Sequence, residues 1–458
     1  MKLTTILSCL LAFYAAYSYA QTPLSDYDLN RPIGWGAMPG FEVTGGAGGQ
    51  EVVVTSEEEF ETAITTKNPA TSERDVPMII YVQGEIEFKQ MHTWHVKNKT
   101  ILGLPGSRIF SKDRTKKNSG ILKFSSGSGA DCENIILRNL TIQGAGAYDT
   151  DGDDALTFQG VKRIWVDHCT IGDGVDGSFD CTHQSDYICV TWCHMIYKID
   201  PLAGGSGGAD DHRFCSLWGQ SDTASECEGH LNTTFANNWW DDGVIERAPR
   251  VRFGKVHIVN NYYTNKTTTG YSIGYGYKSN IYVEKCWFAD GTIPTRDCTF
   301  NAKKGYDTYN MQLVDCQGQT DMKQQVGSVD YFIPSDYYTY EGFDVTLVPT
   351  VVGNTETGAG ANLMVEVGKG VTGYVSGPAP TAIAIVTTPG ASAFATTPGA
   401  SALATTPGAS APATTPGASA PATTPGASAP GSTKLLRNGR LVIVKAGVRY
   451  NALGQKTY

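Results

Sequence analysis

The runs NIILRNLTIQG (residues 134–144), RIWVDHCTIGDG (163–174) and YICVTWCHM (187–195) decide the expected fold. Each is short, rich in β-branched and aromatic residues, and bounded by turn residues, which is typical of strands. Ile135, Trp165 and Ile188 mark the runs at intervals of roughly 23 to 30 residues, which suits one coil of a solenoid. Because helices do not alternate with these strands, a doubly wound fold is excluded, which leaves a β-sandwich, a propeller or a parallel β-helix. Irregular spacing and the lack of tight Asn-Gly hairpins in this region favour an all-β parallel β-helix.

The segments on either side of the strand region have their own composition. Thr55 to Thr66 is the predicted helix, with Ser56 as its cap. From Thr387 the sequence TTPGASAxA recurs every nine residues, which predicts a disordered linker because its small residues cannot bury a core. The last segment has six basic and no acidic residues, and an Asn438-Gly439 turn before a strand at Leu441 to Val444 predicts a small β-module. This segment resembles the surface-sorting tails of secreted Bacteroidetes-type proteins, with a disordered tail as the alternative.

We therefore expect four regions. They are a signal peptide (1–20), a parallel β-helix domain (21–378), a linker (379–433) and a basic sorting or attachment tail (434–458). The signal peptide is predicted from Lys2, the apolar run between Ile6 and Tyr17, and a small-residue cleavage site at Ala20. We expect a monomer that is secreted, or attached to the cell surface through its tail.

Composition excludes some classes of protein. The formal net charge of -9 argues against nucleic-acid binding, which requires a basic face. After the leader, no apolar run reaches the ~18 residues of a membrane-spanning helix. Of 11 cysteines, Cys9 lies in the leader, and the others lack the CxxC spacing of a zinc site. Export permits disulfides, whereas Cys169, Cys189 and Cys193 also suit buried thiols, so the pairing stays open.

Acidic side chains gather about one coil apart. Asp154 precedes the strand-like run ALTF, and Asp176 and Asp180 follow in the next coil. If the coils stack in register, the three carboxylates lie side by side and repel one another unless a hard cation lies between them. Oxygen ligands alone select calcium over zinc. The alternative is that these residues cap turns.

Arginines lie later in the chain, in the run RAPRVR. Arg247 and Arg252 are five residues apart, so a regular strand would place them on opposite faces. Pro249 allows a bend that brings both to one groove. The alternative is a surface ion pair with Glu246 or Asp242, which contributes little stability. Beside an acidic trio, the arginines indicate a site for a carboxylated ligand.

Several stretches of the sequence together resemble a known family. WVDHCTIGDGVDGSFD (165–180), SDYICVTW (185–192) and NTTFANNWWDDGVIERAPRVRFGKVHIVNNYY (232–263) resemble polysaccharide lyase family 1, the pectate and pectin lyases. The resemblance covers residues 34–338. It implies a right-handed parallel β-helix that cleaves polygalacturonate by β-elimination.

The resemblance also implies roles for individual residues. The implied calcium ligands are Asp154, Asp176 and Asp180. Arg247 matches the catalytic base and Arg252 a residue that binds a substrate carboxylate. Trp165, Asp167 and His168 match a segment that is structural in the family.

One position departs from the family pattern. Members often carry a substrate-gripping lysine in a DHDKxxxxGxSD run, whereas the aligned run here is DHRFCSLWGQSD (211–222). Phe214 occupies the lysine position. We expect Arg213 next to it, or Lys198 in the preceding loop, to bind substrate in its place. The Gly-rich loop from Gly204 to Gly208 is expected to border the cleft.

The leading expectation is a calcium-dependent pectate lyase that is most active at alkaline pH, because free arginine is protonated below about pH 12. A pectin lyase, which acts on methyl-esterified substrate without calcium, would be expected to lack the acidic trio. A polygalacturonase hydrolyses with paired carboxylates, such as Asp153-Asp154 or Asp210-Asp211, but leaves RAPRVR unexplained. A non-catalytic pectin-binding surface protein would use Trp239-Trp240 to stack on sugars.

Overall fold

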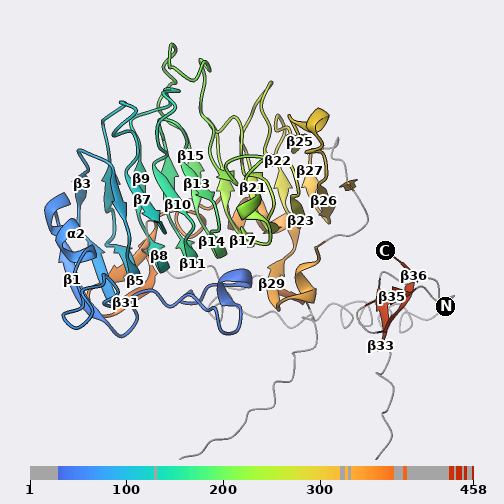
Figure 1. The fold of residues 1–458 in the computed structure, drawn as a ribbon, viewed down its shortest axis with the longest axis horizontal. Helices are drawn as coiled ribbons and strands as arrows, with labels where there is room; N and C mark the ends of the chain where they lie inside the picture. Colours follow the sequence, from blue (N-terminus) through green and yellow to red (C-terminus); the bar gives the residue numbers. More distant parts are fainter. Residues whose placement is uncertain are drawn as a thin grey trace, which may run out of the picture. The chain divides into compact units, whose positions relative to one another are not determined.

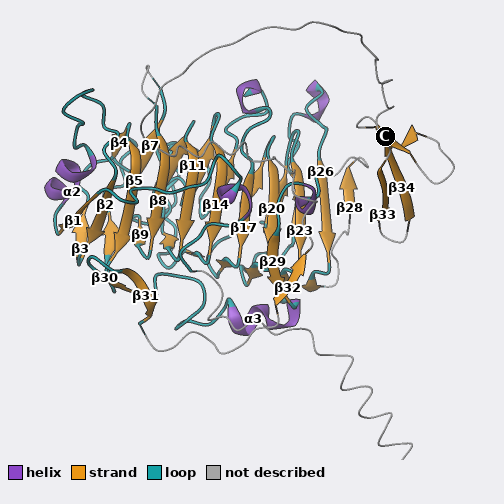
Figure 2. Cartoon of the chain, turned by 90° about the horizontal axis from the view of Figure 1, so that it is seen from below, coloured by secondary structure: helices purple, strands orange, loops and turns teal. Residues whose placement is uncertain are grey.

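Three mainly parallel sheets run through residues 50–327 and form a right-handed parallel β-helix (Figures 1 and 2). The computed structural model describes residues 29–127, 131–319, 325–327, 332–375, 385–388, 433–437, 440–445, 448–450 and 456–457. The chain divides into two units, residues 1–391 and 392–458. The predicted leader and most of the repeat linker lie outside the described residues.

The strands of the first unit belong to the following sheets. The 11-stranded sheet, called the long sheet, contains β1 (Gln50–Val54), β2 (Met78–Val82), β5 (Lys97–Gly103), β8 (Glu133–Arg138), β11 (Lys162–Asp167), β14 (Asp186–Thr191), β17 (Thr233–Ala236), β20 (Lys255–Val259), β23 (Asn280–Glu284), β26 (Asn310–Val314) and β28 (Gln325–Gly327). The eight-stranded sheet, called the site sheet, contains β4 (His92–Trp94), β7 (Leu122–Ser125), β10 (Leu156–Gln159), β13 (Phe179–Thr182), β16 (Leu217–Trp218), β19 (Arg250–Val251), β22 (Ile273–Tyr275) and β25 (Thr295–Asp297). The nine-stranded sheet, called the third sheet, contains β3 (Glu85–Glu87), β6 (Arg108–Phe110), β9 (Thr141–Gln143), β12 (Thr170–Gly172), β15 (His194–Ile196), β18 (Trp239–Trp240), β21 (Tyr262–Tyr263), β24 (Trp287–Phe288) and β27 (Gln317–Gly318). Two antiparallel pairs follow, β29 (Tyr340–Phe343) with β32 (Ile385–Thr388) and β30 (Leu363–Glu366) with β31 (Gly370–Tyr374).

Each central coil passes from the long sheet through the third sheet to the site sheet, as in β11, β12 and β13. The predicted coil repeat is therefore confirmed, but the residue that stacks in line with Ile135 and Ile188 is Ile164 and not its neighbour Trp165. Trp165 stacks between Ile136 and Cys189 instead. The reason is the alternation of strand side chains. Ile164 points into the core, and Trp165 packs with Val43 on the opposite face of the sheet.

The predicted helix closes the N-terminal part of the core. It is α2 (Glu57–Ile64), and the side chain of Ser56 accepts a hydrogen bond from the backbone N–H of Glu59, as a cap residue does. Phe60 is fully buried and packs edge-on against Phe88. Covering the first strands in this way removes apolar side chains from water at an end where no further coil stacks.

The described cysteines are all free thiols. Cys169, Cys189 and Cys193 are completely buried, which agrees with the reading that they pack as small hydrophobes. Burial also raises the pKa of Cys189 and Cys193 above the ordinary thiol value. Among the helices in the described part of the chain, none is long and apolar enough to cross a membrane.

The second unit contains a four-stranded antiparallel sheet. Its strands are β33 (Thr433–Arg437), β34 (Arg440–Lys445), β35 (Val448–Tyr450) and β36 (Lys456–Thr457). The strand predicted at 441–444 lies within β34, which pairs with β33 so that Arg437 faces Arg440. The predicted turn at Asn438-Gly439 lies outside the described residues.

Candidate active site

The three predicted carboxylates meet beside the start of β10 and β13. Leu156 pairs with Phe179 and Thr157 with Asp180, so Asp154 faces Gly177 in the next coil. An added Cβ on Gly177 would lie 2.2 Å from Asp154 Oδ1. The absence of a side chain at Gly177 therefore provides the space that the Asp154 carboxyl group occupies. One oxygen of Asp180 also accepts a hydrogen bond of 2.8 Å from the backbone N–H of Leu217.

Burial raises the pKa of all three carboxyl groups, and nearby carboxylates add to each shift. Burial is the largest cause for each, and it raises the pKa of Asp176 to about 6 and that of Asp180 to about 7, although Arg247 opposes both shifts. The pKa of Asp154 rises well above its ordinary value because burial is reinforced by the charges of Asp180 and Asp176. Such shifts are typical of a buried carboxylate cluster whose negative charge the protein compensates only in part.

A second group of potential metal ligands overlaps this trio. Ligand atoms of Asp149, Asp176 and His212 all lie within 4.8 Å of one another. His212 Nδ1 is 3.5 Å from Asp176 Oδ1 and, within the described part of the chain, has no hydrogen-bond partner. Burial and the charge of Arg247 lower the pKa of His212, which favours its neutral form. The donor set, rich in carboxylate oxygens with only partly compensated charge, fits a divalent cation.

Arg247 approaches the cluster from the turn before β19. Its φ is 60°, in the left-handed region, and its carbonyl accepts a 2.7 Å hydrogen bond from the backbone N–H of Ser216. The Ala248–Pro249 peptide bond is cis. The guanidinium group lies 4.7 Å from the centre of the Phe214 ring. In the described part of the chain Arg247 forms no ion pair, and its buried Nε has no hydrogen-bond partner.

Arg252 lies just after β19 in a different setting. Its Nε forms a 2.6 Å ion pair with Asp222, and Nη1 donates a 2.7 Å hydrogen bond to the carbonyl of Gly219. Only 7% of Arg252 is exposed. Arg252 and Arg247 therefore have different partners. The Nη2 group of Arg252 remains as a hydrogen-bond donor.

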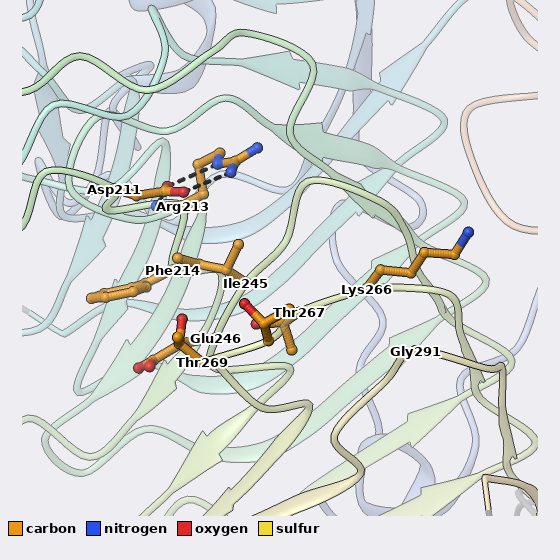
Figure 3. Close-up of a pocket in the computed structure, with 10 residues that line it drawn as sticks. Asp211, Arg213, Phe214, Ile245, Glu246, Lys266, Thr267, Thr269 and Gly291 are labelled. Atoms are coloured by element: carbon orange, nitrogen blue, oxygen red, sulfur yellow. Dashed lines mark hydrogen bonds and ion pairs between the residues drawn. The ribbon is translucent and has the colours of Figure 1, made fainter.

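The two expected replacements for the lysine differ in their surroundings. Arg213 forms a bidentate pair with Asp211, at 2.8 and 2.6 Å, which raises the pKa of Arg213. Both residues line one side of a cleft of about 600 Å³, with Phe214 next to them and Lys266 across from them (Figure 3). Lys198 is exposed, and its backbone N–H donates to Asp173. Neither side chain contacts the acidic trio in the described structure.

The tryptophan pair considered for sugar stacking and the histidine expected to be structural are mostly buried. Trp240 points into the core, and Trp239 is packed under the segment that includes α3 (Val348–Val351), so the pair offers no open sugar-stacking surface. The structural role expected of His168 agrees with its 2.9 Å contact to Asp167, which also forms a buried ion pair with Arg138.

Two residues near the site were missed from the sequence, and a third was recognised in the arginine run without a role of its own. Asp149 lies in an irregular segment, and no periodic pattern indicated its proximity to Asp176. His212 stands inside the run that aligned with the family motif but was given no role. Arg250 is the middle arginine of RAPRVR and was passed over between its neighbours. Its position at the centre of that run is the signal that could have identified it.

Comparison with known proteins decides the family. A model of the family described as pectate lyase matches residues 29–346, well over half of the chain. The chain belongs to the pectate lyase family. It is 34% identical over 235 residues to a probable pectate lyase B of Aspergillus flavus, which covers 50% of this chain and 60% of that protein. It is 29% identical over 255 residues to a pectate trisaccharide-lyase of Thermotoga maritima, with 53% and 60% coverage.

Solved structures agree on the fold. A pectate lyase bound to a hexasaccharide superimposes with a TM-score of 0.54 at 20% identity, over 75% of this chain and 99% of that one. A mutant of Bacillus subtilis pectate lyase gives a TM-score of 0.52, also at 20% identity, over 73% and 98%. The chain spans about 60% of the length of the curated relatives it matches. The resemblance inferred from the sequence is confirmed at the level of family and fold.

Proposed function

We propose that the protein is a calcium-dependent pectate lyase that cleaves α-1,4-linked polygalacturonate by β-elimination. The observation that carries the proposal is a buried carboxylate cluster beside Arg247, which forms no ion pair within the described residues, in a member of this family. The carboxylates suit a divalent cation, and the guanidinium group suits an anionic or proton-donating ligand.

In this proposal Arg247 removes the C5 proton of the uronate whose C4–O bond is cleaved. The electron pair of the C5–H bond forms the C4–C5 double bond, and the C4–O bond breaks with its electrons on the glycosidic oxygen, which water protonates. Phe214 holds the guanidinium plane from one side, and the turn hydrogen bond to Ser216 fixes the backbone. Because arginine accepts a proton only in its neutral form, we expect the rate to rise toward alkaline pH.

Calcium would be held by Asp154, Asp176 and Asp180, the residues whose pKa values are raised. When bound, it would neutralise the substrate carboxylate and so make the C5 proton more acidic. Arg252 would contribute its Nη2 donor to a substrate carboxylate while its ion pair with Asp222 fixes its orientation. Arg213 would contribute Nη1 in the same way from its pair with Asp211, and Lys198 is the alternative cation.

We further propose that the protein is exported and acts outside the cell or at its surface, as the leader-like residues 1–20 and the basic C-terminal segment suggest. Polygalacturonate is the proposed partner, and the protein is proposed to act as a monomer. The polymer is too large to reach a protein inside the cell, which agrees with an exported enzyme.

The test is the absorbance of a 4,5-unsaturated uronate formed from polygalacturonate, with calcium and then with a chelator. A calcium-dependent rise that Arg247→Ala abolishes supports the proposal. New reducing ends without this absorbance would identify a hydrolase, and absorbance that a chelator leaves unchanged would refute calcium dependence. Repeating the assay on highly methyl-esterified pectin distinguishes a pectin lyase.

A further inference from the structure

Most cations on and around the site sheet already have a carboxylate partner. The pairs are Lys123 with Asp153 at 2.8 Å, Arg213 with Asp211 at 2.6 Å, Arg252 with Asp222 at 2.6 Å and Arg296 with Glu246 at 3.3 Å. Arg250 is different. Only 7% of it is exposed, yet it forms no ion pair within the residues that the structure describes.

The charge of Arg250 acts to lower the pKa values of Asp222 and Glu246, but the ion pairs of these carboxylates are with Arg252 and Arg296. Arg250 Nη2 lies 3.5 Å from the carbonyl oxygen of Cys298, a long hydrogen bond, and the buried Nε of Arg250 has no partner in the described part of the chain. Burial and repulsion from Arg252 lower the pKa of Arg250. A buried charge without a direct ion-pair partner is costly to the folded protein. An anionic ligand at this position would remove that cost.

The local backbone is shaped to accommodate this side chain. Arg250 pairs in register with Leu217 on one side and Gly274 on the other. A Cβ added to Gly274 would lie 3.2 Å from Arg250 Cγ, closer than an ordinary contact. Such a Cβ would also lie 2.6 Å from the Tyr271 ring and 2.9 Å from Cys298 Sγ, so the missing side chain of Gly274 gives room to these two groups as well as to the stem of Arg250.

An exposed aromatic ring lies over the guanidinium group. The Arg250 group is 4.8 Å from the centre of the Phe300 ring, and Phe300 is 68% exposed. An exposed phenylalanine has no stabilising reason to face water, since its burial would be worth about 1.5–3 kcal/mol. Because Arg250 covers one face of the ring, the rest of the ring is open to an apolar surface such as the C–H face of a sugar.

We propose that Arg250 and Phe300 form a subsite for one uronate residue of the substrate, with the carboxylate on Arg250 and the pyranose ring on Phe300. The subsite rests on the proposed function, which puts a polyuronate along the site sheet. Asp180 and Arg250 belong to one outward row with Leu217 between them, so the subsite lies two strands, roughly 10 Å, from the acidic trio. A sugar acid satisfies both groups, whereas a neutral sugar leaves the arginine unpaired.

The test compares Arg250→Leu with the wild-type enzyme on polygalacturonate. Loss of a charge-assisted hydrogen bond is worth roughly ten- to a hundredfold in affinity, so KM should rise by about this factor while kcat stays within about twofold. The difference should shrink as methyl esterification of the substrate increases, because an ester carries no charge for Arg250 to bind. An unchanged KM for Arg250→Leu would overturn the subsite.

Matched variants separate binding from folding. Arg250→Lys keeps the charge and should give an intermediate KM, and Phe300→Ala removes an exposed ring and should raise KM several-fold. Arg108, which lies 4.2 Å from the Phe110 ring on the third sheet, provides the control, since Arg108→Leu should leave KM unchanged. If Arg250→Leu does not fold, normal KM values for both Arg250→Lys and Phe300→Ala overturn the proposal.

The subsite and the proposed function can fail separately. Binding of polygalacturonate is measured without turnover by affinity electrophoresis in an Arg247→Ala background. If the wild-type chain releases no unsaturated product, the lyase function fails, and the binding comparison still decides the subsite. If the wild-type chain is active but Arg250→Leu binds and turns over polygalacturonate normally, the subsite alone is wrong.

Discussion

Substitution of Asp180 by Asn should stabilise the metal-free protein at neutral pH. Burial, with a smaller contribution from the charge of Asp176, raises the pKa of Asp180 from 3.8 to about 7. The folded protein therefore binds a proton more tightly than the unfolded chain between these values, so the free energy of unfolding falls as pH rises through this window. A shift of about 3 units corresponds to about 4 kcal/mol at ~1.36 kcal/mol per unit. Asn does not titrate and still accepts the hydrogen bond from Leu217, so the variant escapes this loss.

The measurement is urea unfolding of wild-type and Asp180→Asn protein in a chelator, between pH 4 and pH 8. The stability of the variant relative to the wild type should increase by about 4 kcal/mol over this range. With calcium at about 100 times its Kd, the wild type should gain about 2.7 kcal/mol, whereas the variant should gain far less. A stability difference that does not change with pH, or an equal calcium gain in both proteins, would refute the reasoning.

Further predictions concern other contacts. Gly177→Ala places a methyl group against the Asp154 carboxyl group and should weaken calcium binding, measured by calorimetry, without changing the far-UV spectrum. Arg252→Leu leaves Asp222 buried without its ion-pair partner, with a hydrogen bond from Asn301 remaining, and should cost about 3–5 kcal/mol in urea unfolding, whereas a stability loss below about 1 kcal/mol would contradict this role. Burial lowers the pKa of Lys99 to about 8, so the folded protein binds fewer protons than the unfolded chain above that pH. The free energy of unfolding should therefore rise by up to about 3 kcal/mol between pH 8 and 10.5, and Lys99→Met should remove this slope.

The fold could be predicted from the sequence because strand repeats are a local signal. The runs around Ile135 and Ile188 and the cap at Ser56 follow from residue type and spacing alone. The register of the strands was harder to predict. Trp165 was chosen as the marker because it is large, whereas Ile164 occupies the stacked interior position. A large aromatic residue is as stable under a covering segment as inside the coil, and only the alternation along the strand distinguishes the two.

The candidate site was predictable where its residues fall one coil apart. Asp154 and Asp180 were placed together by that spacing, and the structure brings them close enough for the charge of Asp180 to raise the pKa of Asp154. Asp149 and His212 were not predicted to lie in the site, because both belong to irregular segments. His212 lies in the loop that follows β15, and backbone N–H groups of that loop hold Asp149. The Trp239-Trp240 pair was predicted to be available for sugar stacking, but Trp239 is covered by a segment from about a hundred residues later in the chain. No local pattern in the sequence indicates this cover.

The charges of the site are kept apart by the fold. Arg247 influences the pKa of Asp154, Asp176 and Asp180, yet it forms no ion pair with any of them within the described chain. Direct pairing would be the lower-energy arrangement for an isolated pair, but the left-handed turn at Arg247 and its contact with Phe214 oppose it. Phe214 therefore does what a lysine at that position could not, because a second cation would repel the guanidinium group instead of holding it. In the proposed mechanism this separation leaves the carboxylates available to a cation and the guanidinium group available to the substrate.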